Sequence, residues 1–185
     1  FICELDDAQQ LYSRDDIERL ADYIIWVVAK GQAISDGRPQ DYSHVGQVAD
    51  ALKVFHAESD EHVNVLKAVT SAAVIGNAEL LRRVQALRAT VLQSMLNSQV
   101  KFTGSVYGPM QCMLKGICAQ CLQWQIDPAT GQRTKAVYAC SWHHQPMDII
   151  DIDNLDQRLE QNRVQETLSS LWLDHLLAFN EVDRI

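Results

Sequence analysis

Four of the five cysteines lie close together in the sequence, in a spacing that is typical of a metal centre. They follow the order C-x5-C-x2-C-x18-C, and they are Cys112, Cys118, Cys121 and Cys140. Cysteine is otherwise sparse and singly buried, so four in one short segment indicate a shared ligand. In a C-x2-C pair, one tight turn presents two thiolates to a single centre. The fifth cysteine, Cys3, is interpreted as an ordinary structural thiol.

A β-hairpin is expected to bring the last cysteine back to the others. Residues 122–126 and 135–139 have the composition of strands, and a polar turn with Pro128 and Gly131 lies between them. Proline fixes φ and glycine permits a positive φ, so this segment favours a tight reversal. The hairpin would return the last cysteine to the end that holds the C-x2-C pair, which predicts a pocket of four thiolates.

Three occupants fit such a pocket to different degrees. A plant-type [2Fe–2S] cluster uses C-x4-C-x2-C with a distant fourth cysteine, and the first gap here is one residue longer. Structural zinc bound by four cysteines prefers two C-x2-C knuckles, and this chain has one. Disulfides suit small secreted domains, whereas this chain shows no signal peptide and is large enough for a core. The spacing favours the iron–sulfur cluster, with a zinc-stapled structural or interaction module as the alternative.

The residues around the cysteines resemble a known family. Residues 107–112 read Tyr-Gly-Pro-Met-Gln-Cys, and residues 116–121 read Gly-Ile-Cys-Ala-Gln-Cys. They resemble the C-terminal part of the ferredoxin-reductase-type flavoproteins, notably the electron-transfer subunit of bacterial dihydroorotate dehydrogenase and its fused FAD/NAD(P) oxidoreductase relatives. The resemblance spans roughly residues 24–150. It implies that Cys112, Cys118, Cys121 and Cys140 bind a [2Fe–2S] cluster that passes electrons from flavin to a partner.

The same resemblance bears on nucleotide binding. Residues 74–81 are similar to a strand–turn–helix that lies near the nicotinamide in the family, which makes Gly76 a candidate nicotinamide-side contact. An ordinary strand-to-helix turn explains this glycine as well. The sequence contains no G-x-G-x-x-G loop for a pyrophosphate. We therefore expect FAD and NAD(P) only in a full-length protein, whose flavin domain or redox subunit would be the partner of this chain.

The elements that must position these residues alternate between strands and helices. Strands are expected at 24–29, 69–75 and 100–106, since each is a short apolar run. Helical spacing of apolar residues indicates helices at 45–55 and 77–95. This βαβαβ order predicts an α/β fold with half of a doubly wound parallel sheet. A helix is also expected from Ser13, which begins a capping-box pattern.

The expected domains follow from this order. Residues 1–110 would form the partial nucleotide-binding-like domain, residues 111–152 the four-cysteine subdomain with an edge strand at 147–152, and residues 153–185 a helical tail. The tail repeats apolar residues at helical spacing, and such a face needs cover, for which a second copy of the chain is one candidate. The apolar residues at this helical spacing are Val164, Leu168, Leu171, Trp172, Leu176 and Phe179.

Composition narrows the function classes. The 185 residues carry a net charge of −8, which argues against nucleic acid as a partner. No apolar run has the length of a membrane span, and clustered thiols without a visible targeting segment suggest the cytoplasm. No catalytic nucleophile or acid–base pair is recognisable. Because the chain begins with Phe1, we expect it to be the C-terminal part of a longer oxidoreductase that is not competent alone.

Overall fold

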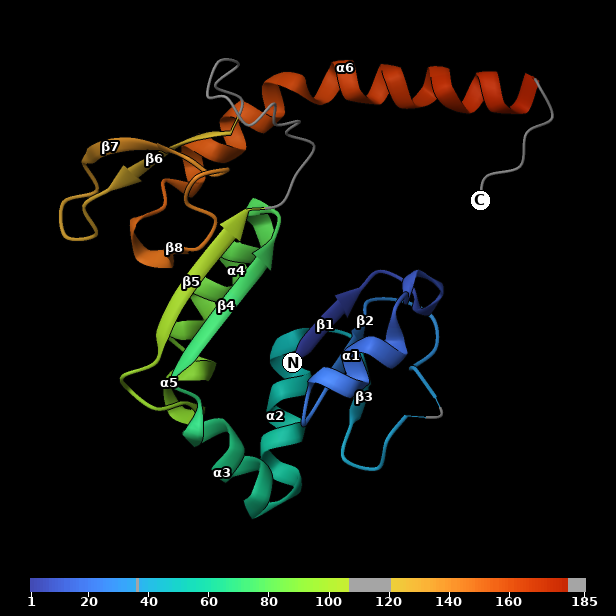
Figure 1. Ribbon diagram of the computed structural model, residues 1–185, viewed down its shortest axis with the longest axis vertical. Helices are drawn as coiled ribbons and strands as arrows, with labels where there is room; N and C mark the ends of the chain where they lie inside the picture. The colour runs from blue at the N-terminus through green and yellow to red at the C-terminus, as the bar shows by residue number, and fades with distance from the viewer. Residues whose placement is uncertain (36, 107–120, 180–185) are drawn as a thin grey trace. The chain divides into compact units, whose positions relative to one another are not determined.

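The computed structural model describes residues 1–35, 37–106 and 121–179, and these residues form two compact units. The first unit comprises Phe1–Thr70 and Ala86–Val100. The second comprises Ser71–Gln85 and the chain from Lys101 onward. Figure 1 shows the elements of both units, which are described separately below.

The first unit contains a three-stranded parallel sheet in the order β1-β2-β3. The strands are β1 (Ile2–Leu5), β2 (Ile25–Val28) and β3 (Tyr42–Val45). The register places Ile25 between Ile2 and Tyr42. All four residues of β2 are buried, which is the environment that a continuous apolar run requires.

Five helical segments complete the first unit. They are a 3-10 turn at Ala8–Gln10, α1 (Arg14–Leu20), α2 (Val48–Glu58), α3 (Asp60–Ala68) and α5 (Val91–Met95). Helix α2 buries Ala51, Leu52 and Phe55, which share one face at helical spacing. Ser59 separates α2 from α3, and its hydroxyl accepts a hydrogen bond from the His62 amide at 3.2 Å. The His62 ring then stacks on Phe55 with centroids 3.8 Å apart.

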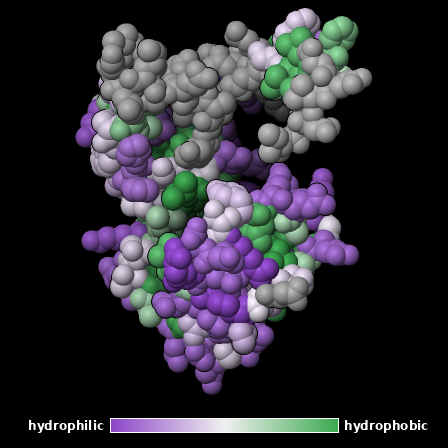
Figure 2. Space-filling view, turned by 45° about the vertical axis from the view of Figure 1, so that its right-hand side comes forward, coloured by the Kyte–Doolittle hydropathy of each residue, from purple (hydrophilic) through white to green (hydrophobic). Residues whose placement is uncertain are grey.

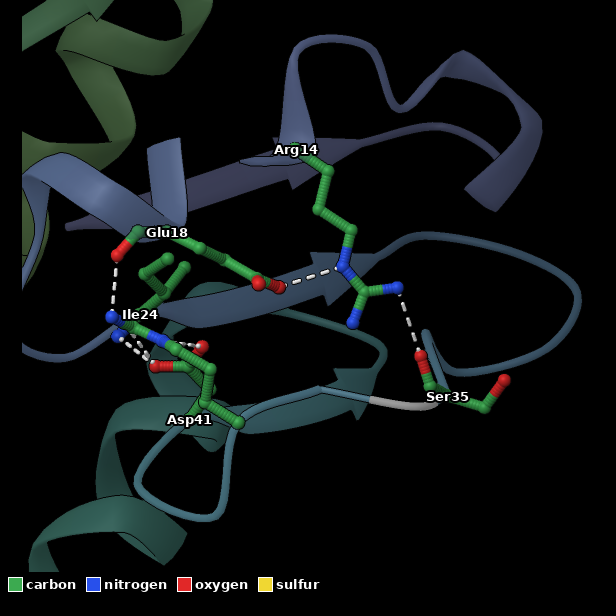
Figure 3. A network of polar contacts seen from close by, with 6 residues as sticks. Arg14, Glu18, Ile24, Ser35 and Asp41 are labelled. Carbon is green, nitrogen blue, oxygen red and sulfur yellow. Dashed lines mark hydrogen bonds and ion pairs between the residues drawn. The ribbon is translucent and has the colours of Figure 1, made fainter. Parts of the chain in front are cut away.

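A network of polar contacts fixes the loops that lead into β2 and β3 (Figure 3). The Arg38 guanidinium donates to both carboxylate oxygens of Asp41, at 2.8 and 2.9 Å. The Asp41 side chain is only 2% exposed, and it also accepts from the Ile24 amide at 3.0 Å. On α1, Arg14 pairs with Glu18 at 2.7 Å and donates to the Ser35 carbonyl at 3.1 Å. Charge-assisted bonds of this kind hold irregular backbone in one conformation.

The second unit contains a mixed sheet in the order β4-β5-β8. Strands β4 (Ser71–Gly76) and β5 (Lys101–Val106) are parallel, and the short β8 (Gln145–Pro146) is antiparallel to β5. Helix α4 (Ala78–Arg88) follows β4 and packs Leu81 into the core. A Cβ atom on Gly104 of β5 would lie 2.9 Å from side-chain atoms of both Leu81 and Ile150. Glycine at this position therefore lets the flanking elements close on the sheet.

A β-hairpin and a long helix complete the second unit. The hairpin consists of β6 (Leu122–Ile126) and β7 (Arg133–Tyr138). Its turn is closed by Asp127, whose carbonyl accepts from the Gly131 amide at 2.8 Å, and Gly131 has φ +69°. A 3-10 turn (Met147–Ile149) then leads to α6 (Ile152–Phe179). The predicted pair of hairpin strands and the C-terminal helix are thus confirmed, whereas the four-cysteine subdomain stays a prediction.

The α/β class is confirmed, but the predicted single parallel sheet is not formed. Strand β2 pairs with β1 and β3, whereas β4 and β5 belong to another sheet. The edge strand predicted at 147–152 is not formed: Met147–Ile149 is a 3-10 turn, Ile150 makes an isolated antiparallel bridge with Gln125, and α6 starts at Ile152. The helix predicted at 77–95 is interrupted at residues 89–90 between α4 and α5.

The start of helix α1 agrees with the prediction, but its expected cap is not formed. Helix α1 starts after Ser13 as predicted, but Ser13 has φ +51° and its side chain makes no capping hydrogen bond. None of the described helices is long and apolar enough to cross a membrane. The expected domain boundaries at residues 110 and 152 stay a prediction. The two compact units describe how the chain packs, and they do not test which part carries which function.

Candidate metal centre

The hairpin brings two of the four predicted ligands together. Cys121 directly precedes β6, and Cys140 lies two residues beyond the end of β7. The Ala139 amide donates to the Cys121 carbonyl at 3.0 Å, which extends the pairing of the two strands to their open end. The Cys121 and Cys140 sulfurs are 3.5 Å apart. Cys121 is 6% exposed and Cys140 is half-buried.

The separation of the two sulfurs has a chemical meaning. A disulfide bond is about 2.05 Å long, so these atoms are not covalently joined. Two thiolates on one tetrahedral metal ion, each at about 2.3 Å from it, lie about 3.8 Å from each other. The observed 3.5 Å is close to that value. The same distance is an ordinary contact of two thiols, in which the Cys121 Sγ–H donates a hydrogen bond to Cys140 Sγ.

The remaining predicted ligands, Cys112 and Cys118, lie in residues 107–120 and so outside the described residues. In the part of the chain that the structure describes, no group of three or more metal-binding side chains gathers. Two of the four predicted ligands, Cys121 and Cys140, belong to that part of the chain. Cys3 lies on β1 in the other compact unit, and burial raises the pKa of its thiol.

Three buried glutamines lie on β6 and on the neighbouring β8, and sequence reasoning missed them. Cys121, Gln123 and Gln125 occupy alternate positions along β6 and share its buried face. Gln145 of β8 lies between the two strand glutamines. It accepts from Gln125 Nε2 at 2.8 Å and donates through its own Nε2 to Gln123 Oε1 at 2.6 Å. We call Gln123, Gln125 and Gln145 the glutamine chain; the sequence signal was the alternation Cys-x-Gln-x-Gln.

One member of the glutamine chain is incompletely bonded. Gln123 is 3% exposed, and its Nε2 has no hydrogen-bond partner among the described residues. Leaving a buried donor unsatisfied costs about 1–3 kcal/mol, so such a group usually faces an acceptor. Gln123, which carries this unsatisfied donor, is two residues from Cys121 along the sequence.

The segment after Cys140 forms a tight turn over the end of the hairpin. The Ser141 and Trp142 amides both donate to the Tyr138 carbonyl at 3.0 Å. Trp142 is half-buried, and the Lys135 ammonium lies 5.3 Å from the centre of its ring. The following His143 and His144 are exposed. The turn therefore keeps an aromatic ring, and not the two imidazoles, against the hairpin.

Contacts from α6 and its approach hold the hairpin in place. The Asp151 amide donates to the Trp124 carbonyl at 2.9 Å, and the Asp151 carboxylate pairs with Arg133 at 2.8 Å. From the first turns of α6, Arg158 donates to the carbonyl of Leu122, the residue after Cys121. Both strands of the hairpin are thus tied to the helix that follows them.

The candidate nicotinamide contact has a clear structural role. Gly76 ends β4 opposite Val106, and Asn77 then caps α4 by accepting from the Leu80 amide at 2.9 Å. A Cβ atom on Gly76 would lie 2.4 Å from the end of the Leu80 side chain. Gly76 thus lies at a strand-to-helix turn against the Leu80 side chain, and its contact with a nicotinamide stays a prediction.

Comparison with known proteins gives a short match. No family model matches the chain. The chain is 44% identical over 61 residues to an uncharacterized protein, RP006, of Rickettsia prowazekii (strain Madrid E). The match covers 33% of this chain and 8% of that protein. The chain thus spans a small fraction of its relative, whose name specifies no activity.

Proposed function

We propose that this chain is the C-terminal electron-transfer portion of a larger FAD/NAD(P)-dependent oxidoreductase. Cys112, Cys118, Cys121 and Cys140 would hold a [2Fe–2S] cluster, which supplies one-electron transfer when bound. The observation that carries the proposal is the 3.5 Å approach of the Cys121 and Cys140 sulfurs at the end of the hairpin. The C-x5-C-x2-C-x18-C spacing supports it from the sequence.

The residues around the cysteine pair suit such a role. The near-complete burial of Cys121 keeps water from one sulfur, while the half-buried Cys140 leaves a side of the site close to the surface. Electrons can therefore enter or leave near Cys140 without a long path through the protein. Trp142 shields this side in part, and limited solvent exposure is one of the properties that set the potential of a cluster.

The partners follow from the same proposal. The flavin domain of the same protein, or a separate redox subunit, would supply or receive the electrons. FAD and NAD(P) would bind in the full-length protein, with Gly76 on the nicotinamide side, and the protein would act in the cytoplasm. A zinc ion fits the sulfur separation equally well, and a zinc-stapled interaction module is the outcome that a metal analysis must distinguish.

Substitution of one ligand tests the metal assignment. In Cys140→Ser, a hydroxyl replaces a thiolate that lies 3.5 Å from its neighbour, so we expect cluster binding to be lost. The measurement is the anaerobic visible spectrum with iron, sulfide and zinc quantified on the same sample. The unchanged protein should hold about two irons and two sulfides per chain, with broad bands that dithionite bleaches.

Cys3→Ser is the matched control, because it makes the same chemical change outside the proposed ligand set. It should keep the spectrum and iron content of the unchanged protein. Equal iron in Cys140→Ser and in the unchanged protein would refute the assignment of Cys140. A colourless protein with about one zinc per chain would replace the electron-transfer function with the structural module.

A further inference from the structure

We infer that an exposed apolar face of α6 joins two copies of this chain in a two-fold symmetric dimer. Hydrophobic residues gather toward the C-terminal end of this helix, at the upper right of Figure 2. The inference does not depend on the proposed function, because it involves no cysteine and no metal. We use the name α6 face for Val164, Leu168, Leu171, Trp172, His175 and Phe179.

The residues of the α6 face share one side of the helix. At about 100° per residue, their positions fall within an arc of about 100°, which is the usual width of a stripe that packs against another element. The His175 ring approaches the rings of Trp172 and Phe179, with centroids 5.8 and 6.3 Å away. These ring contacts place the three side chains on the same side of α6.

The α6 face is exposed although it is apolar. Its exposed fractions are 70% for Val164, 62% for Leu168, 58% for Leu171, 62% for Trp172 and 78% for Phe179. The start of the same helix packs into the core of the second unit through Ile152 and Leu155, which are 5% and 2% exposed. Those two positions lie about 180° round the helix from the middle of the α6 face. The side of α6 that anchors it in its own unit is therefore not the α6 face.

The area of the α6 face matches what a stable dimer needs. From the exposed fractions and the usual sizes of the side chains, its five hydrophobic residues offer about 700 Å² on each copy. A standard interface buries about 800 Å² on each partner. A two-fold dimer buries the same patch on both copies, so one helix face supplies most of the area that such a dimer requires.

The charge of the α6 face favours a second copy over a partner of opposite charge. Its six residues include no carboxylate, lysine or arginine, and Asp174 is the one acidic residue between positions 167 and 179. The whole chain carries a net charge of −8, so two copies repel each other where their acidic surfaces meet. At the α6 face two copies meet without opposing carboxylates, and a basic partner finds no acidic cluster there.

The test is sedimentation equilibrium of the 185-residue chain under reducing conditions, which prevent disulfide links between copies. We expect a dimer with a dissociation constant of about 10 μM or lower. Leu171→Asp places a carboxylate on the α6 face of both copies, so the dissociation constant should rise at least about a hundredfold. Leu173→Asp is the matched control. Leu173 is 53% exposed and lies about 150° round the helix from the middle of the α6 face, so its constant should change less than about twofold.

Each outcome decides the inference. A monomer at about 100 μM in the unchanged chain would overturn it and leave the α6 face to a different protein segment. A dimer that survives Leu171→Asp, or that Leu173→Asp weakens equally, would also overturn it, because the contact would then not be made by this face. If Leu171→Asp lowers the helix content in circular dichroism, Leu171→Ala decides, since alanine favours helix. It must weaken the dimer about tenfold, and Leu173→Ala less than about twofold.

Discussion

Removal of the metal followed by mild oxidation should join Cys121 to Cys140. Their sulfurs are 3.5 Å apart, so they must approach each other by about 1.5 Å to form a bond. Small rotations about the side-chain bonds provide a movement of this size, and the paired strands need not separate. If both thiolates bind the proposed metal, we expect the pair to resist oxidation while the metal is present.

The size of the resulting stabilisation follows from the loop that the bond closes. Cys121 and Cys140 are 19 residues apart, and the chain-entropy relation then gives about 3 kcal/mol relative to the reduced, metal-free hairpin. With a stabilisation of about 3 kcal/mol, the crosslinked hairpin opens about a hundredfold less often than the reduced, metal-free hairpin. The Ala139 amide, which donates to the Cys121 carbonyl, should exchange with solvent more slowly by that factor.

Peptide mass spectrometry under non-reducing conditions provides the assay, with hydrogen exchange at Ala139 as the second readout. The main product should be a crosslink between the peptides of Cys121 and Cys140, while the Cys3 peptide stays unlinked. A product in which Cys121 is joined mainly to Cys112 or Cys118 would refute the reasoning, because the 3.5 Å approach of Cys121 to Cys140 would then not have directed the bond. Unchanged exchange at Ala139 in the crosslinked protein would refute the estimated stabilisation.

Two further predictions concern the fold that carries the site. Asp41→Asn removes the charge from a buried carboxylate that accepts from Arg38 and Ile24, so urea unfolding should show a loss of about 1.5–3 kcal/mol. The exposed pair of Asp50 with Lys53 is the control, since Asp50→Asn should cost less than about 0.5 kcal/mol. Gly104→Ala places a methyl group 2.9 Å from Leu81 and Ile150, and overpacking should lower the free energy of unfolding by about 1–3 kcal/mol. No loss in Asp41→Asn, or a gain in Gly104→Ala, would contradict these assignments.

The elements with strong local signals were predictable from the sequence. The apolar run at β2, the helical spacing in α2 and the turn of the hairpin all depend on residues within one segment. The partners of β2 were not predictable in this way. Strands β1 and β3 are four-residue segments of mixed polarity, and their pairing with β2 depends on contacts more than fifteen residues away.

The candidate site was likewise predictable only where it depends on local sequence. The approach of Cys140 to Cys121 followed from the hairpin turn, which is local. The glutamine chain did not, because Gln145 comes from a strand that pairs with β5 and reaches the hairpin only through the tertiary fold. A buried glutamine also contradicts the usual composition of a core, so the alternation Cys-x-Gln-x-Gln was a weak signal for Gln123 and Gln125, and no signal marked Gln145 as interior.

The glutamine chain explains why the hairpin is held in one orientation. Apolar side chains in these positions would pack with little directional preference, whereas each amide bond requires one donor and one acceptor at a fixed angle. Gln123 and Gln125 are bound to the same residue of β8, so a shift of β6 by one residue would break both bonds. These bonds fix β6 relative to β8, whereas the pairing of β6 with β7 aligns Cys121 with Cys140. Among these three glutamines, Gln123 alone has a buried amide donor without a partner in the described structure, and local departures from ordinary packing of this kind are expected where a protein carries its chemistry.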